Sequence, residues 1–211
     1  MNLTLTVFRR LSLYLHYLKQ LPPEVTRISA TTIASDLGLG EVLVRKELSQ
    51  ASAAAGRPKT GYVVASLIHA LENFLGYNQL CRAVVAGAGK LGRALMGYDG
   101  FTDYGLYIAA AFDINEEIIG TQEAGRPILS MEDLPVFCRQ QTVDIGIITV
   151  PGIAAQSVCD RLCENGVRAI WCFAPAALSA PEGVLIQYEN MAASLAMLSS
   201  HLKHISEQQV I

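Results

Sequence analysis

The segment "VVAGAGKLGRAL", residues 84–95, contains three glycines spaced as G-x-G-x-x-G directly after an apolar run. Gly87 permits a tight turn, Gly89 lets a pyrophosphate approach the backbone, and Gly92 allows a helix to pack closely on a strand. The helix that follows would present backbone N–H groups to the phosphates. We therefore predict a dinucleotide-binding loop formed by Gly87, Ala88, Gly89, Lys90, Leu91 and Gly92.

The residues after position 80 alternate between apolar strands and helices. Strands are predicted at 81–87, 106–113, 126–130, 143–151, 168–175 and 184–189, and helices at 90–98, 131–140 and 152–165. Near-continuous apolar strands separated by helices are typical of a doubly wound parallel sheet, because helices cover both of its faces. The sequence thus predicts an α/β fold, with a Rossmann-like sheet over residues 79–188 and a C-terminal helix within residues 189–211.

Residues at the ends of other predicted strands would complete the dinucleotide site. Asp113 ends the second strand, where a carboxylate accepts hydrogen bonds from the adenine ribose and repels a 2′-phosphate. This favours NAD(H) over NADP(H). Two further strands end in "TVP" (149–151) and "FAP" (173–175), at the edge where ligands bind such sheets. They add Thr149, Val150, Pro151 and Phe173 to the predicted site. These residues also suit ordinary turns, and the sequence alone leaves that interpretation open.

The first eighty residues predict a separate helical module. Apolar residues recur at helical spacing over residues 8–20 and again over residues 64–75. Before the second of these helices, the segment "AAAGRPKTGYVV" has glycines and a proline around two basic residues, which favours a basic hairpin. With a further helix pair between them, these elements would make a winged-helix domain over residues 1–78.

That helix pair has the spacing of a helix-turn-helix. Ser29 is an expected N-cap, and the small residue Ala34 is followed by Gly38 at the turn. The apolar Val44 then stands ten residues after Ala34 and would close the small core. A plain helical hairpin with a polar outer face would show a similar pattern.

The second helix of the motif carries side chains that suit phosphates and base edges. Residues 1–76 hold eight Lys/Arg against five Asp/Glu, whereas residues 77–211 hold eight against fourteen. A basic module joined to an acidic one indicates that the first part meets a polyanion. The residues expected to face DNA are Arg45, Lys46, Ser49 and Gln50 on the helix, with Arg57 and Lys59 on the wing.

Composition argues against several other classes of protein. Hydrophobic residues make up 51% and charged residues 17%, which argues against disorder. Apolar runs are shorter than a membrane span, the N-terminus has no signal-peptide pattern, and the five cysteines include no CxxC pair. We therefore expect a cytoplasmic protein with buried thiols, without a metal site and without membrane contact.

The predicted sheet also lacks the groups that a dehydrogenase requires. A hydride-transfer enzyme needs a general acid or base at the reaction centre. The four histidines lie outside the predicted strands, the sequence has no Tyr-x-x-x-Lys, and no lysine occurs between Lys90 and Lys203. We therefore predict no catalytic residues, and a receptor for the dinucleotide instead of an enzyme that consumes it.

Several segments together resemble the Rex family of bacterial redox-sensing repressors. The resemblance covers roughly residues 8–205 and rests on the winged helix and on "VRKELS" (44–49), "GAGKLGRALMGYDGF" (87–101), "AAFDINEEIIG" (110–120), "IITVPGIAAQ" (147–156) and "FAPAAL" (173–178). It implies a homodimer that binds a palindromic DNA operator when NAD⁺ is abundant and leaves it when NADH binds. It also implies a C-terminal helix, here residues 189–205, that is exchanged between subunits.

This chain departs from the family pattern at its implied switch. The family has an arginine on the first helix where this chain has His16, and an aspartate at the start of the last helix where it has Asn190. With the tyrosine that matches Tyr98, these side chains form part of the family's ligand-dependent contact between domains. Since a neutral pair interacts more weakly than a charged one, we expect NADH to release DNA less completely here.

Two other functions remain open from the sequence. One is a small NAD-dependent oxidoreductase with a helical appendage, which steady hydride turnover would reveal. The other is a module that binds CoA or another nucleotide and does not bind DNA, and whose N-terminal helices serve only to dimerise.

Overall fold

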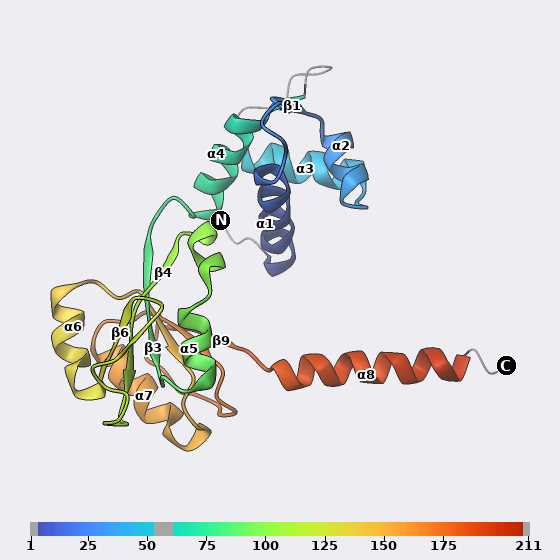
Figure 1. Cartoon of the computed structure of the whole chain (residues 1–211). Coiled ribbons are helices and arrows are strands. Elements are labelled where there is room, and N and C mark those ends of the chain that lie inside the picture. Colours follow the sequence, from blue (N-terminus) through green and yellow to red (C-terminus); the bar gives the residue numbers. More distant parts are fainter. Residues whose placement is uncertain (1–3, 53–60, 209–211) are drawn as a thin grey trace. The chain divides into compact units, whose positions relative to one another are not determined.

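The computed structural model describes residues 4–52 and 61–208 of the chain. The chain divides into two compact units, Met1–Gln79 and Leu80–Ile211 (Figure 1). The described elements of the first unit are α1 (Leu5–Lys19), β1 (Arg27–Ile28), α2 (Ala30–Asp36), α3 (Glu41–Ala51), β2 (Tyr62–Val63) and α4 (Val64–Leu75).

The first unit folds around the apolar faces that the sequence predicts. The buried side chains of α1 are the four that recur at helical spacing. Helix α4 adds three more, so that one cluster holds Leu11, Tyr14, Leu15, Leu18, Val64, Leu67 and Leu71. At the start of α2, the Ser29 hydroxyl accepts a hydrogen bond from Thr32 N at 2.9 Å. Gly76 ends α4 with a φ of 79°, a left-handed conformation that favours glycine.

The helix-turn-helix has the predicted core. Ala34 and Val44 are buried, and Leu39 N donates to Ala34 O at 2.8 Å across the turn. Gly38 takes a φ of +65° there, which a larger residue would adopt only with strain. The predicted basic hairpin falls mainly on residues 53–60, which lie outside the described residues. Its last strand, β2, pairs antiparallel with β1, a pairing that the sequence did not predict.

The second unit is built on a seven-stranded sheet within the described residues. Its strands are β3 (Cys81–Ala86), β4 (Leu106–Asp113), β5 (Gln122–Glu123), β6 (Arg126–Ser130), β7 (Ile145–Ile148), β8 (Ala169–Cys172) and β9 (Leu185–Tyr188). They lie in the order β5-β6-β4-β3-β7-β8-β9, and only the β5–β6 pair is antiparallel. Without β5 this is the strand order of a Rossmann fold, which reverses between β3 and β7.

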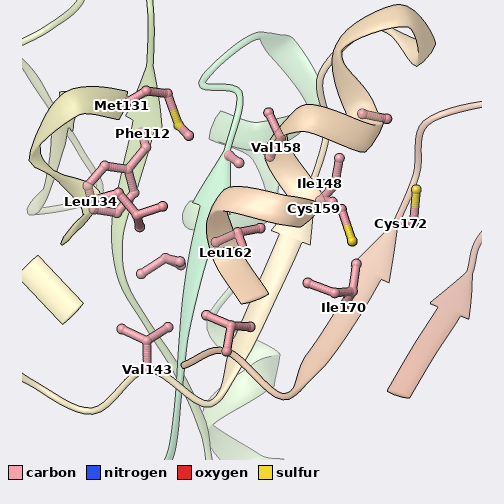
Figure 2. Packing of buried hydrophobic residues seen from close by; sticks show 14 of the residues in the cluster. Phe112, Met131, Leu134, Val143, Ile148, Val158, Cys159, Leu162, Ile170 and Cys172 are labelled. Atoms are coloured by element: carbon pink, nitrogen blue, oxygen red, sulfur yellow. The ribbon is translucent and has the colours of Figure 1, made fainter. Parts of the chain in front are cut away.

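Alternate residues of a strand point to opposite faces of the sheet, so each strand contributes side chains to two cores. Helices cover both faces. Val84 and Ala86 of β3 belong to a core with α6 (Leu134–Gln140) and α7 (Gly152–Glu164), which Figure 2 shows. The alternate residues Ala83 and Val85 belong to a second core with α5 (Lys90–Met96). The predicted doubly wound α/β fold is therefore confirmed.

Some element boundaries differ from those predicted. The helix predicted over 90–98 ends at Met96, and a 3-10 helix, η1 (Asp99–Tyr104), follows it. The helix predicted over 131–140 starts as a 3-10 turn, η2 (Met131–Asp133). The strand predicted over 143–151 is confined to β7, partly because Pro151 has no N–H to donate to a ladder. The short edge strand β5 was not predicted.

The described part of the chain ends in α8 (Met191–Gln208). Its apolar side chains follow a repeat of four and three residues, and Met191, Leu195, Leu198 and Leu202 are all exposed. A second apolar surface lies on the sheet, where a hollow of about 510 Å³ is lined by Leu106, Ile145, Ile147, Ala169, Ile170, Trp171, Leu185, Ile186 and Gln187. Within residues 4–52 and 61–208, no helix has the length and apolar character needed to cross a bilayer.

Candidate functional site

The glycine loop lies at the point where the strand order reverses. Gly87 has a φ of +99°, and a Cβ there would stand 2.9 Å from Val150 Cγ1. A Cβ on Gly92 would stand only 2.0 Å from Gly87 O, so helix α5 approaches the loop more closely than any side chain allows. By contrast, a Cβ on Gly89 would meet no atom within 4 Å. The space beside Gly89 is therefore open to a ligand, as a pyrophosphate requires.

The segment after β7 fixes the glycine loop in place. Thr149 N donates to Ala86 O at 2.9 Å, and the Thr149 hydroxyl donates to Gly87 O at 2.7 Å. Thr149 was predicted to lie on the nicotinamide side of the site, but its hydroxyl is engaged with the loop. Its neighbours Val150 and Pro151 lie at the same edge. Nothing in the sequence signalled that the threonine would hold the loop.

Asp113 also contacts the glycine loop. Its Oδ2 accepts a hydrogen bond from Ala88 N at 2.6 Å, and its Oδ1 accepts from Ile114 N and Asn115 N at 2.8 and 2.9 Å. A carboxylate has about four acceptor positions, so this arrangement leaves about one for a ribose hydroxyl. Asp113 thus joins the loop after β3 to the loop after β4, besides standing where the predicted ribose contact would form.

Arg93 is a loop contact that the sequence analysis missed. Its Nε donates to Ala88 O at 3.0 Å, and its Nη1 lies 3.8 Å from Glu123 Oε2 on β5. Both backbone groups of Ala88 are therefore held: its C=O accepts from Arg93, and its N–H donates to Asp113. The two predicted residues that begin α5 differ in exposure, since Lys90 is exposed and Leu91 is half-buried.

A row of aromatic rings joins Tyr98 to the end of β8. The ring centroids of Tyr98 and Phe101 are 4.9 Å apart, those of Phe101 and Trp171 are 5.9 Å apart, and those of Trp171 and Phe173 are 4.6 Å apart. Phe173 N donates to Ile148 O, directly before Thr149. Tyr98 is 57% exposed at the outer end of this row. The predicted residues Tyr98 and Phe173 therefore belong to one packed cluster.

In the first unit, α3 presents its polar residues on one face. Arg45, Lys46, Ser49 and Gln50 are exposed, as predicted for a DNA-facing helix. Two of these groups already have partners within the helix. Arg45 forms an ion pair with Glu41, and the Ser49 hydroxyl donates to Lys46 O at 2.8 Å. Arg57 and Lys59 lie outside the described residues.

The opposite face of α3 contains a buried ionic contact with α1. Glu47 is 3% exposed, and its two carboxylate oxygens accept hydrogen bonds from Arg10 Nε at 3.0 and 3.1 Å. Tyr14 Oη donates to Glu47 Oε2 at 2.7 Å. Burial raises the pKa of Glu47, but the hydrogen bonds from Arg10 and Tyr14 outweigh it, so that the pKa is lowered. Glu47 therefore stays ionised and joins α3 to α1.

Two of the predicted switch residues make local contacts. His16 is exposed, and its Nε2 lies 2.8 Å from Gln20 Nε2. Asn190 Oδ1 accepts a hydrogen bond from Ala193 N at 2.9 Å and so acts as an N-cap for α8. His16 belongs to one unit, and Asn190 and Tyr98 belong to the other. Their coupling stays a prediction.

The cysteines are all free thiols in the described chain. Cys159 and Cys172 are buried, as predicted, whereas Cys81, Cys138 and Cys163 are half-buried. Burial raises the pKa of Cys159 to about 12, with a further contribution from Cys163. Since the thiolate is the nucleophilic form, this thiol is unreactive at neutral pH.

Known families and proteins are similar to both units. Residues 78–176 match the family described as "CoA binding domain", and residues 3–49 match "Putative DNA-binding protein N-terminus". The "Redox-sensing transcriptional repressor Rex" of Porphyromonas gingivalis is 40% identical over 93% of this chain and 90% of its own length.

Solved structures give the same result over almost the whole chain. The structure of RSP in complex with β-NAD⁺ and operator DNA matches with a TM-score of 0.89 and 30% identity, over 99% of this chain and 96% of that one. RSP in complex with β-NADH matches with a TM-score of 0.82 and 29% identity, over 99% and 98%. With a relative that is 40% identical over nine tenths of both chains, this protein belongs to the Rex family of redox-sensing transcriptional repressors.

Proposed function

We propose that this chain is a DNA-binding transcriptional repressor that responds to the ratio of NADH to NAD⁺. One observation carries the proposal: a glycine loop with open space beside Gly89 stands in the same chain as a helix-turn-helix with a polar α3 face. The relative of the same family is named a redox-sensing repressor, and RSP is solved with β-NAD⁺ and operator DNA and with β-NADH. We place the protein in the cytoplasm, because its ligand would be the bacterial chromosome.

The proposed cofactor is NAD(H), bound at the carboxyl edge of the sheet. Gly87, Ala88, Gly89, Lys90, Leu91 and Gly92 would hold the pyrophosphate, and Asp113 would accept a ribose hydroxyl. Thr149, Val150, Pro151 and Phe173 would border the nicotinamide, with Tyr98 on the outer side. Among the residues of the described sheet edge we assign no general acid or base, so the dinucleotide is proposed as a signal and not as a substrate.

We also propose that the protein is a homodimer. The exposed stripe of α8 and the hollow over β7, β8 and β9 are both apolar, and a dimer interface would bury such surfaces away from water. Introducing Asp at Leu195 and Leu198 together should give a monomer, because the apolar seam would then carry two charges. Sedimentation velocity measures this, and Ser200→Asp, on the opposite side of the same helix, is the matched control. A double variant that stays dimeric would place the interface elsewhere.

The test of the function is DNA binding with and without dinucleotide. A duplex selected by the full-length protein from a randomised library is titrated by fluorescence anisotropy, with NAD⁺ or NADH present. We expect NADH to weaken binding, and to do so incompletely because His16 and Asn190 replace a charged pair. Selection of no DNA would favour the nucleotide-binding module, and steady oxidation of NADH would favour the oxidoreductase.

The same titration tests the α3 face. Arg45→Ala with Lys46→Ala should weaken every duplex alike and lower the slope of log K against log salt by about two, since each lost phosphate contact removes about one. Arg139→Ala, on α6 of the other unit, is a control for the loss of positive charge. If the double variant binds as tightly as the parent, α3 does not enter the groove.

A further inference from the structure

One exposed residue on the proposed DNA-facing side of α3 is apolar. Val42, the second residue of the helix, is 81% exposed. Residues four and seven positions apart on a helix share a face, so Val42 lies on the face of Lys46 and Ser49. The opposite face of α3 packs into the core of the unit through Val44, Glu47, Leu48 and Ala51. Val42 therefore makes no contribution to that core.

The surroundings of Val42 favour DNA over a protein partner. Arg45 and Lys46 are exposed on the same side of the helix, and Arg45 pairs with Glu41. Lysine is depleted at the centre of protein interfaces, whereas the phosphates of a duplex attract both lysine and arginine. In the major groove, the C5-methyl group of thymine is the apolar group that base edges present. The first residues of a recognition helix are those that reach base edges.

We propose that Val42 is a specificity-determining residue that contacts the methyl group of a thymine in the major groove. This inference rests on the proposed DNA binding. The other exposed residues of that face, Arg45, Lys46, Ser49 and Gln50, can donate or accept hydrogen bonds. Leu43, the next residue along the helix, is only 37% exposed and lies about a quarter-turn away. Val42 is thus the apolar group placed to distinguish thymine from cytosine.

The test replaces thymine by uracil, which differs only in lacking the C5-methyl group. In the selected duplex, each dT is replaced by dU in turn, at both symmetric positions when the site is a palindrome. For the parent protein, replacement at one position should weaken binding by about fourfold per methyl contact. Val42→Ala should weaken the unmodified duplex by a similar factor and should then be insensitive to dU at that position. Val42→Thr, which keeps one methyl group, should fall between them.

The helix propensity of alanine and one control variant keep the result interpretable. Alanine favours helix more than valine does, so any loss of affinity in Val42→Ala cannot come from unfolding of α3. Val136→Ala, at a 45% exposed valine on α6 of the other unit, should change neither the affinity nor the dU pattern. If the parent selects and binds a duplex, but every dU effect persists in Val42→Ala, the methyl contact is overturned while DNA binding stands. If the parent binds no DNA, the proposed function fails, and this inference fails with it.

Discussion

Gly89→Val should strongly weaken dinucleotide binding and leave the fold intact. Gly89 has a φ of −70°, which any residue adopts, and its Cβ position faces open space. The valine side chain would then occupy the space that the pyrophosphate needs, and we expect the affinity for NADH to fall about a hundredfold or more. Isothermal titration with NADH measures the affinity, and thermal unfolding measures the stability of the same sample.

Two other glycines serve as comparisons. Gly92→Ala places a Cβ 2.0 Å from Gly87 O, so α5 or the loop must move, and both NADH affinity and stability should fall. Gly97→Ala meets only ordinary contacts, at 3.7 Å and beyond, and should change neither. Unchanged NADH affinity in Gly89→Val would show that the dinucleotide does not lie against this loop.

Glu47→Gln should strongly destabilise the first unit. The substitution removes the buried charge that balances Arg10, and one neutral amide oxygen must replace the two carboxylate oxygens that accept from Arg10 and Tyr14. Breaking a buried ion pair from one side is among the costliest single changes, and in a unit of this size we expect its melting temperature to fall by about 10 °C or more. Scanning calorimetry of the full chain measures the shift.

The control for Glu47 is Glu72, which forms an ion pair with Lys19 at 2.9 Å in the same unit. Its side chain is partly solvated, and such pairs contribute little, so Glu72→Gln should lower the melting temperature by much less. Equal shifts in the two variants would mean that the buried contact is no stronger than the solvated one.

The effect of Glu47 depends on pH in a definite direction. Because the pKa of Glu47 is lowered in the folded protein, its contribution to stability is present above the unfolded pKa, about 4.3, and is lost as the pH falls through the folded value. The difference in melting temperature between the parent and Glu47→Gln should therefore shrink as the pH is lowered below about 4. A difference that stays constant would assign the loss to packing and not to charge.

The local pattern of the sequence determined the fold class and most of the elements. The spacing of apolar residues specified α1 and α4, and Ser29, Gly38 and Gly76 marked the ends of helices. The three glycines of the loop specified a strand, a turn and a helix in that order. These features depend on the conformational preferences of single residues and on neighbours a few positions away, and both can be read from the sequence.

Contacts between distant segments were decided only by the tertiary structure. The Thr149 hydroxyl binds Gly87, Arg93 binds Ala88, and Glu47 binds Arg10 and Tyr14 across 37 and 33 residues. The sequence presents the same residue types at many other positions, so nothing local distinguishes these. Asp113 illustrates the difference: its position at a strand end was predictable, but its hydrogen bond to Ala88 requires β3 and β4 to be neighbours. The order of the strands depends on how helices bury both faces of the sheet, and that burial exists only in the packed structure.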